Sequence, residues 1–418
     1  MSRAVETLVP ARLGTSFRWL LASSWLTNFG DGIALAAGPL LVASQTRDPF
    51  VVALAVLLQQ LPWLLFGLYA GALADRLDRR AIVITADLLR AGVLVVLASA
   101  VVTGTVSVAV VLVALFLLGT AEVFTDTTTS TLLPMIVSRD DLGVANARIQ
   151  TGFITVNQLA GPPLGAALFT VGMAWPFAAQ ALLIAAGPLC VWRVALPAHG
   201  RAAAGGTSHI RHDIVEGFRW VAHHAAVRTL VLTIFTFNIT YGAAWSVLVL
   251  YATDRLGMGE IGFGLLTTVS AVGGLLGTTL YGWITRRVSL GNILRVGLII
   301  ETLTHLGLAV TTVPAVAMGI FFVFGAHAFI WGTMSVTVRQ RAVPTELQGR
   351  VGSVNMLGVF GGMVAGSAIG GVIAQHWGVT APFWFAFVGS AVFVAAIWGQ
   401  LSQVAHADEA ALSGGHMR

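Results

Sequence analysis

Long apolar segments recur along the chain and are separated by short polar connections. Each segment holds about 20 residues, which is enough for a helix to cross the hydrocarbon core of a bilayer. A helix is the expected form, because backbone polar groups inside a bilayer must be satisfied within their own segment. We count twelve such segments, centred near residues 31, 62, 92, 118, 157, 185, 240, 271, 301, 327, 362 and 390. The pattern predicts an all-α integral membrane protein with twelve transmembrane helices.

The composition agrees with this class of protein. Of the 418 residues, 56% are hydrophobic and only 10% are charged, and the mean hydropathy is +0.85. A soluble domain carries about 25% charged residues to cover its surface. All 23 basic residues are arginines, and the pI is near 10.3. A basic pI raises the question of a nucleic-acid partner, which the positions of the arginines answer.

The arginines gather on alternate connections. With the N-terminus in the cytoplasm, the even-numbered connections hold Arg76, Arg79, Arg80, Arg139, Arg286, Arg287, Arg339 and Arg341. The odd-numbered connections hold only Arg47 and Arg255. Cytoplasmic loops are enriched in basic residues, so this bias predicts that both termini are cytoplasmic. The basic charge is then a topology signal and indicates no nucleic-acid partner. We expect the first apolar segment to be a retained helix and not a cleaved signal.

One long polar stretch divides the chain into two sets of six segments. We predict an N-terminal six-helix bundle at residues 1–196, a cytoplasmic linker at 197–227, a C-terminal six-helix bundle at 228–401 and a cytoplasmic tail at 402–418. An amphipathic helix in the linker is indicated by apolar residues at helical spacing, namely Ile210, Ile214, Phe218 and Val221. Paired halves with a central loop are typical of secondary transporters, whose binding site lies near the bilayer midplane.

Metal and disulfide chemistry are not expected. Half of the ten histidines lie in the linker, namely His199, His209, His212, His223 and His224. Solvated side chains explain them better than a metal site, because no cysteine or carboxylate completes a ligand pattern. The single Cys190 excludes an internal disulfide.

The connection after the second segment resembles a known loop motif. Gly71, Asp75, Arg76, Arg79 and Arg80 match the pattern G-x-x-x-D-R-x-G-R-R of the major facilitator superfamily, with Asp78 in place of the usual Gly. A carboxylate at a helix end can pair with an arginine and face another helix N-terminus, so the resemblance implies a latch between the two halves. The alternative is a simple topology anchor.

The fifth segment resembles a second motif of this superfamily. Gly152, Gly161, Pro162 and Gly165 have the spacing of the antiporter motif of proton-coupled drug exporters, with Ala166 in place of the last Gly. "GSAIGG" at residue 366 matches "GPPLGA" at residue 161 in the other half. Glycines at this spacing permit close helix approach, which ordinary packing also uses. Over the whole chain the sequence is similar to the branch that includes macrolide efflux proteins and the enterobactin exporter.

Acidic residues lie inside the apolar segments of the first half. Asp31 is in the middle of the first segment, where an ionised carboxylate costs about 2.5–3.5 kcal/mol unless it meets water or is protonated. Glu122 and Asp126 share one helix face, and adjacent carboxylates often share a proton. All three are candidates for proton coupling or cation binding, whereas we interpret Asp87 and Arg90 as a structural pair. For Asp31 the alternative is a packing hydrogen bond, and for Glu122 a structural role. For Asp126 the alternative is a partnership with Arg90 or a cap on the cytoplasmic side.

The second half offers fewer titratable candidates. Glu301 and His327 lie at mid-depth in the ninth and tenth segments. The superfamily resemblance implies that the first, fourth, seventh and tenth helices line a central cavity. Residues placed there are candidates for substrate contact, with interfacial anchoring or packing as the alternative for the tryptophans: Asn28, Trp25, Asn238, Trp245 and Trp331.

The sequence thus predicts a secondary transporter that exports amphipathic small molecules by proton antiport. It works without a cofactor, with the proton gradient as energy source, and as a monomer in the lipid bilayer. A specific exporter of a siderophore or of a self-made antibiotic is the alternative, and a proton-coupled importer a further one. No G-x-x-x-x-G-K-[ST] motif is present, which excludes an ATP-driven pump in this chain, and no catalytic motif indicates an enzyme.

Overall fold

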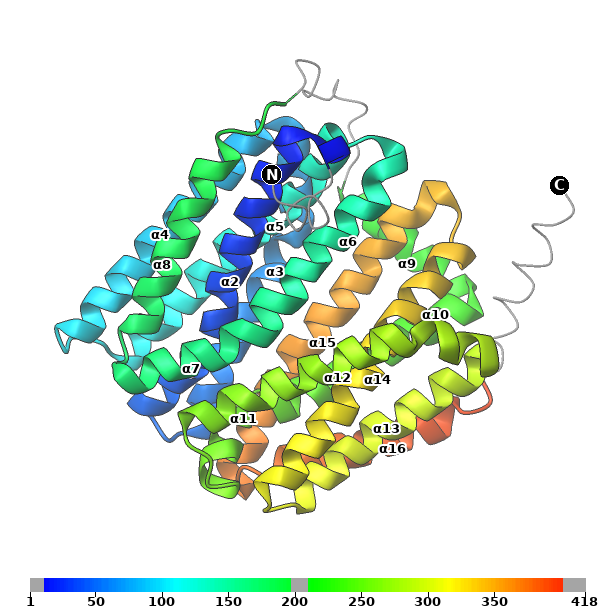
Figure 1. The fold of residues 1–418 in the computed structure, drawn as a ribbon. Helices are drawn as coiled ribbons and strands as arrows, with labels where there is room; N and C mark the ends of the chain where they lie inside the picture. The colour runs from blue at the N-terminus through cyan, green and yellow to red at the C-terminus, as the bar shows by residue number, and fades with distance from the viewer. Residues whose placement is uncertain (1–10, 197–209, 401–418) are drawn as a thin grey trace, which may run out of the picture. The chain divides into compact units, whose positions relative to one another are not determined.

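The computed structural model describes residues 11–196 and 210–400, and every regular element in these two ranges is a helix. The first part of the chain forms the short 3-10 helices η1 (Ala11–Leu13) and η2 (Arg139–Asp141), the π-helix η3 (Phe153–Ala160), and α2 (Gly14–Gln45), α3 (Pro49–Arg76), α4 (Arg79–Val102), α5 (Val108–Ile136), α6 (Leu142–Gly152), α7 (Gly161–Val171) and α8 (Trp175–Val191). Figure 1 traces these helices in chain order.

The second part of the chain is built in the same way. It forms α9 (Ile210–His223), α10 (Ala225–Trp245), α11 (Leu248–Leu250), the π-helix η4 (Tyr251–Arg255), α12 (Glu260–Arg287), α13 (Leu290–Val310), α14 (Pro314–Ala342), the 3-10 helix η5 (Thr345–Leu347), α15 (Gln348–Trp377) and α16 (Ala381–Ile397). The expectation of an all-α membrane protein is confirmed.

The helices that can cross a membrane follow the predicted segments. Among the described residues, nine helices are long and apolar enough, namely α2, α3, α4, α5, α10, α12, α13, α14 and α15. Helices α8 and α16 are apolar but shorter. The predicted segment near residue 157 is divided among α6, η3 and α7. The total of twelve spans and the cytoplasmic location of both termini stay predictions.

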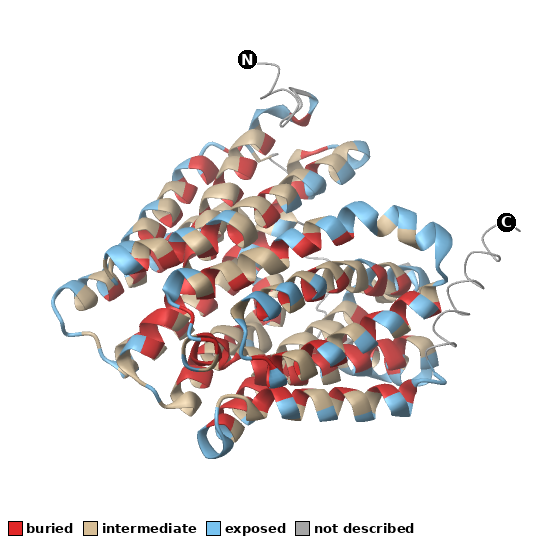
Figure 2. Ribbon diagram, turned by 60° about the horizontal axis from the view of Figure 1, so that its bottom comes forward, coloured by how far each residue is buried: buried red, intermediate tan, exposed pale blue. Residues whose placement is uncertain are grey.

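Many large apolar side chains of the described helices are exposed. Figure 2 shows the exposed positions along the helices in pale blue. Val96, Leu182 and Val392 expose 66%, 73% and 65% of their surface. A soluble protein rarely leaves so much apolar surface in water, whereas lipid tails solvate it without cost. The exposed apolar surface therefore agrees with a chain embedded in a bilayer.

The chain divides into two compact units. Unit 1 comprises Met1–Thr46, Leu61–Thr207 and Gly259–Thr268, and unit 2 comprises Arg47–Gln60, Ser208–Met258 and Val269–Arg418. In unit 1, α2 packs against α7 and α8, and α4 packs against α5 and α8. In unit 2, α10 packs against α15 and α16, and α13 packs against α14 and α16. The domain limits predicted from the sequence stay a prediction.

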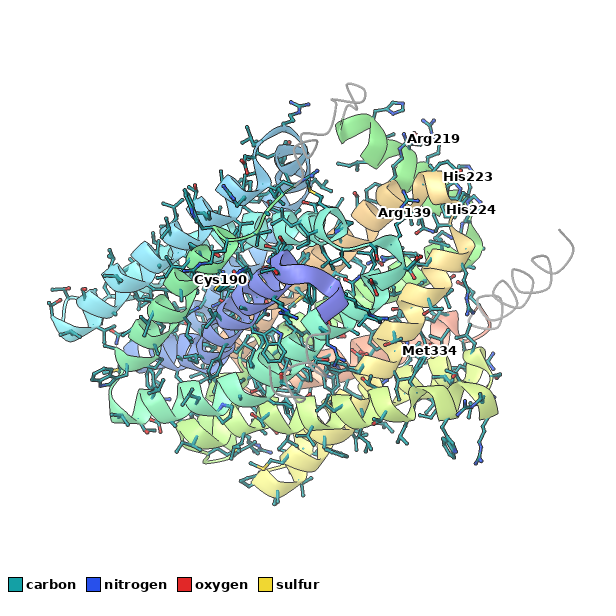
Figure 3. All side chains as sticks on the ribbon, turned by 45° about the horizontal axis from the view of Figure 1, so that its top comes forward. Arg139, Cys190, Arg219, His223, His224 and Met334 are labelled. Atoms are coloured by element: carbon teal, nitrogen blue, oxygen red, sulfur yellow. The ribbon has the colours of Figure 1, made fainter. Side chains whose placement is uncertain are left out.

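Helix α9 occupies part of the predicted linker, whose residues 197–209 lie outside the described ranges. Its Val221 is buried against Val351 and Val354, whereas Phe218 is exposed. Figure 3 shows His223 and His224 close together at the end of α9. Their Nδ1 atoms lie 2.7 Å from the carbonyl oxygens one helical turn before them, so these two histidines donate to the helix backbone.

Candidate functional site

A cluster of charged side chains lies inside unit 1, where α2, α4 and α5 meet. Arg90 on α4 is 2% exposed and donates to Asp31 on α2 through Nη2. Its Nη1 lies 3.5 Å from Oδ1 of Asp87, one turn earlier on α4. The guanidinium therefore binds two carboxylates on two helices, and Asp31 has a charged partner that the sequence did not indicate.

Asp87 is the most deeply buried carboxylate of this cluster, with no exposed side-chain surface. Thr125 on α5 donates to its Oδ1 over 3.1 Å, so Asp87 joins α4 to α5. Since a hydroxyl and a guanidinium both donate to one oxygen, this carboxylate is held firmly in place. The prediction that Asp87 and Arg90 pair is consistent with this geometry.

Asp31 is more accessible than its partners. Its side chain is 19% exposed, and Gln180 on α8 donates to its Oδ1 over 3.4 Å. Asp31 thus accepts from a charged donor, Arg90, and from a neutral one, Gln180.

Two further carboxylates on α5 act on the same arginine. Arg90 interacts electrostatically with Asp31, Glu122, Asp87 and Asp126. Glu122 is half-buried, and Asp126, one helical turn later, is exposed. This group of four carboxylates and Arg90 is the acidic cluster below. Fully ionised, it holds four negative charges and one positive charge.

The glycines of the fifth predicted segment bring this segment against α2. A Cβ built on Gly165 would collide with the carbonyl oxygen of Ile33, and one on Gly161 would collide with the backbone of Gly32. A Cβ on Gly152 would collide with the indole of Trp25. Gly32 directly follows Asp31, so the close approach of the two segments fixes the position of that carboxylate.

A π-helix separates Gly152 from Gly161. Residues Phe153–Ala160 form η3, and the N–H of Gly161 donates to the carbonyl of Val156, five residues earlier. Pro162 and Pro163 follow and have no N–H, so the carbonyls of residues 158 and 159 lose their α-helical donors. Thr268 in turn donates to the carbonyl of Leu159 over 3.3 Å. The proline pair thus explains the break in the helix.

The corresponding helix of unit 2 has the glycines but not the break. Cβ atoms on Gly362, Gly366 and Gly370 of α15 would collide with carbonyl oxygens of α10. Helix α15 contains no proline and runs as an α-helix from Gln348 to Trp377. The internal repeat noted in the sequence is therefore a repeat of close helix packing. Helix α15 has no counterpart of the π-helix η3.

A second group of polar side chains lies in unit 2, between α13 and α14. Nε2 of His327 lies 3.4 Å from Oε2 of Glu301, with side-chain exposures of 4% and 14%. A Cβ on Gly297 would lie 2.9 Å from the rings of both His327 and Trp331, so this glycine makes room for the two side chains. Two predicted candidates from separate helices thus form a pair.

Aromatic rings from α10 and α14 continue this group. Tyr241 and Trp245 stack with ring centroids 4.4 Å apart, and Phe324 lies 5.0 Å from Trp245. Phe321 is 5.4 Å from Trp245, and the ring of His305 meets the same indole edge-on at 6.0 Å. The sequence singled out Trp245, whereas Tyr241 and the two phenylalanines gave no signal beyond ordinary apolar positions.

The other predicted cavity residues make local contacts. Asn28 donates to the carbonyl of Ser24 over 2.8 Å, and Asn238 donates to that of Ile234 over 2.7 Å. The indole of Trp25 donates to the carbonyl of Arg148 over 3.4 Å and packs on Gly152. A packing role is thus visible for Trp25, and a role of these residues in substrate contact stays a prediction.

The predicted loop motif surrounds the start of α4. Asp78, which stands where the superfamily has Gly, caps this helix by accepting from the N–H groups of Arg80 and Ala81 over 2.9 and 3.2 Å. Arg79 donates to the sulfur of Met135 over 2.8 Å. Arg80 donates to two carbonyls that follow α8, each over 3.3 Å. Arg76 is exposed, and the side chain of Asp75 lies outside the described part, so the latch stays a prediction.

Comparison with known proteins identifies the family of this chain. The family described as transmembrane secretion effectors, a branch of the major facilitator superfamily, matches residues 6–417. The chain belongs to this family. It is a multi-pass membrane transporter and not an enzyme.

Similar proteins agree with this assignment. The chain is 27% identical over 388 residues to the multidrug efflux pump Tap of Mycolicibacterium fortuitum, covering 87% of this chain and 90% of that protein. Among solved structures, a variant of the nucleoside transporter NupG gives a TM-score of 0.76 at 11% identity, covering 92% of this chain and all (100%) of that one. A bacterial homologue of the iron transporter ferroportin gives 0.67 at 17% identity, covering 90% and 98%. At these identities the structures show the shared fold alone.

Proposed function

We propose that this transporter exports amphipathic small molecules in exchange for protons. Two observations outside the acidic cluster support export. The protein Tap, to which the chain is similar, is a multidrug efflux pump. The spacing of Gly152, Gly161, Pro162 and Gly165 resembles the antiporter motif of proton-coupled drug exporters. Their close contacts with α2 and with Trp25 give this motif a physical role.

The acidic cluster is the observation on which proton coupling rests. Arg90 is one positive charge among four carboxylates. Asp31, Asp87 and Glu122 are at least half-buried, and an uncompensated carboxylate in hydrocarbon costs about 2.5–3.5 kcal/mol even on the lenient insertion scale, so we infer that the buried carboxylates in excess of Arg90 bind protons or cations. Protons from the acidic side of a membrane are available in every transport cycle, which makes them the natural coupling ion.

We place the coupling step at Asp31. When Asp31 takes up a proton, it loses its charge, and its ion pair with Arg90 weakens. The guanidinium then interacts more strongly with Glu122 and Asp126, which it already reaches electrostatically. Such a shift of partner links proton uptake to a movement of α4 and α5 relative to α2. A secondary transporter uses movements of this kind to alternate access between the two membrane faces.

A narrower exporter, specific for a siderophore or a self-made antibiotic, would use the same cluster. The two possibilities differ in the range of compounds transported and not in coupling. An importer is less favoured, because the antiporter-type motif and the relative Tap both indicate efflux.

The proposal is tested in inside-out membrane vesicles with an acidic lumen and a pH-sensitive dye. Cationic amphipathic compounds are added to the wild type, to Asp31→Asn and to Asp140→Asn, whose side chain is exposed in η2. We expect a compound to release lumenal protons through the wild type and through Asp140→Asn but not through Asp31→Asn. Equal proton release by all three proteins would remove Asp31 from the coupling step.

A further inference from the structure

Helix α9 packs against unit 2 at the ends of two long apolar helices. Oε1 of Glu216 lies 2.9 Å from Nη1 of Arg350, near the start of α15. A Cβ on Gly217 would lie 2.6 Å from the carbonyl oxygen of Arg350, so the two backbones approach closely. At its other end α9 is separated from α10 by His224 alone. Since α10 and α15 are long and apolar enough to cross the membrane, α9 lies at the membrane surface.

One face of α9 is apolar and exposed. Val215 and Phe218 are 56% and 51% exposed, and Ala222 is exposed as well. Their spacing of three and four residues places them on one face of the helix. Helix α15 contacts a different face, which contains Gly217 and the buried Val221. An apolar helix face at the membrane surface enters the boundary between lipid headgroups and acyl chains.

Basic side chains lie beside this apolar face. Arg219 and His223 are exposed and lie one helical turn apart on α9 (Figure 3). Nδ1 of His223 lies 2.7 Å from the carbonyl oxygen of Arg219, which fixes the ring next to the arginine. Arg228 is also exposed and donates to the carbonyl of Ala222 over 2.7 Å. A second guanidinium is therefore held at the end of α9.

The acidic side chain on the described part of α9 is compensated. Among the α9 side chains that the structure describes, Glu216 is the single carboxylate, and it pairs with Arg350. Nδ1 of His212 lies 3.8 Å from the other oxygen of Glu216. Since Arg350 balances the charge of Glu216, the positive charge of Arg219 is available to an anionic partner. The negative groups at a membrane surface are the phosphates of anionic phospholipids, which attract basic residues there.

We propose that α9 is a docking surface for anionic phospholipids of the adjoining membrane leaflet. Val215 and Phe218 insert among the acyl chains, and Arg219 donates to the lipid phosphate. Because α9 is fixed to α15 through Glu216 and Arg350, the bound lipids hold unit 2 at the membrane surface. This surface contains no residue of the acidic cluster, so lipid binding does not depend on proton exchange.

The test measures which lipid surrounds a single fluorescent probe on α9. Cys190, the only cysteine, is replaced by serine, and an NBD group is attached through Ala222→Cys on the exposed apolar face. The purified full-length protein is placed in nanodiscs of equal parts phosphatidylcholine and phosphatidylglycerol. A trace of one lipid carries a nitroxide on its acyl chain and quenches the probe. We expect phosphatidylglycerol to be enriched about fivefold over phosphatidylcholine beside the probe, the effect of one arginine near an anionic surface.

Further substitutions in this background identify the groups responsible. Arg219→Gln should remove most of the preference for phosphatidylglycerol, and Arg219→Lys should keep most of it, because the charge is retained. Arg350→Gln should weaken the preference, since Glu216 then opposes Arg219. The double variant Arg350→Gln, Glu216→Gln should restore it. Arg139→Gln, an exposed arginine of η2, is the matched control and should leave the preference unchanged.

The inference is overturned if both labelled lipids quench the probe equally, or if Arg219→Gln keeps the preference. Absence of quenching by either lipid also contradicts it, because α9 would then lie away from the leaflet. Loss of the preference in Arg139→Gln would indicate a general effect of protein charge and not a surface on α9. If inorganic phosphate replaces chloride at constant ionic strength and abolishes the preference, the surface binds free phosphate instead of lipid.

Discussion

Arg90 on α4 donates to Asp31 on α2 and, through its other terminal nitrogen, lies 3.5 Å from Asp87 on its own helix. The contact with Asp31 joins α4 to α2, and the contact with Asp87 lies within α4. Asp31 is the more exposed carboxylate of the two. Arg90 therefore contacts one carboxylate on a neighbouring helix and a more deeply buried one on its own helix.

Replacement of Arg90 should destabilise the protein strongly. Arg90→Gln leaves buried Asp87 and neighbouring Asp31 without their counter-charge, and breaking a buried ion pair costs about 3–5 kcal/mol. We expect a marked fall in the thermal unfolding temperature of the purified protein in detergent, followed by tryptophan fluorescence.

The double variant Arg90→Gln, Asp31→Asn supplies the control for this prediction. Removing both partners leaves fewer unpaired charges, so part of the lost stability should return. If the two single substitutions add up without coupling, the contact between Arg90 and Asp31 contributes nothing, and the interpretation of the cluster is wrong.

Gly165 should tolerate no side chain. A Cβ there collides with the backbone of Ile33, which cannot move aside as a side chain can. Gly165→Ala is expected to push α7 away from α2 and to lower the initial rate of substrate transport in vesicles by about tenfold or more. Gly143→Ala, on α6 where no atom lies within 4 Å, is the matched control and should transport normally.

Gly152 offers a different outcome, because its neighbour is a side chain. A Cβ at this position would collide with the indole of Trp25. Gly152→Ala should therefore lower both stability and transport, and the additional substitution Trp25→Leu should restore part of each by removing the ring. Thermal unfolding and the vesicle assay measure the rescue. The absence of any rescue would show that Gly152 serves something other than contact with Trp25.

The proline pair should be needed for transport although it weakens the helix. Pro162→Ala, and more fully Pro162→Ala with Pro163→Ala, returns N–H donors to the carbonyls of residues 158 and 159. A regular α-helix has fewer residues per turn than a π-helix, so converting η3 to an α-helix would rotate Gly152 relative to Gly165. We expect unchanged or higher thermal stability with slower transport. Normal transport by the double variant would contradict a role for η3.

The helices and the acidic residues could be predicted from the sequence because both are local properties. Hydropathy identified the segments, and carboxylates such as Asp31 and Glu122 stand out in an apolar run. The partner of Asp31 could not be predicted, since Arg90 lies 59 residues away and only helix packing brings it near. Arg90 is interpreted from the sequence as the structural partner of Asp87, three residues earlier, and the structure adds its contact with Asp31.

Two further features could not be predicted from the sequence: which residues of different helices form pairs, and the local form of the backbone in the fifth segment. Glu301 and His327 were selected separately, and only the packing of α13 on α14 shows that they are partners. The break in the fifth segment has a sequence signal in Pro162 and Pro163, which lack N–H donors. Its form as a π-helix depends on which carbonyls find other donors, such as Leu159 with Thr268. Aromatic positions such as Tyr241 are indistinguishable from ordinary apolar positions without neighbouring helices.

The central claim is that the acidic cluster couples substrate movement to protons. Its most direct test uses proteoliposomes that contain only this protein, with an imposed pH gradient and no membrane potential, and measures ethidium inside. We predict that the wild type accumulates ethidium above its external concentration, whereas Asp31→Asn only lets it equilibrate. Equal accumulation by Asp31→Asn and by the variant Glu122→Gln, Asp126→Asn would contradict the account, because no carboxylate of the cluster would then be needed for coupling.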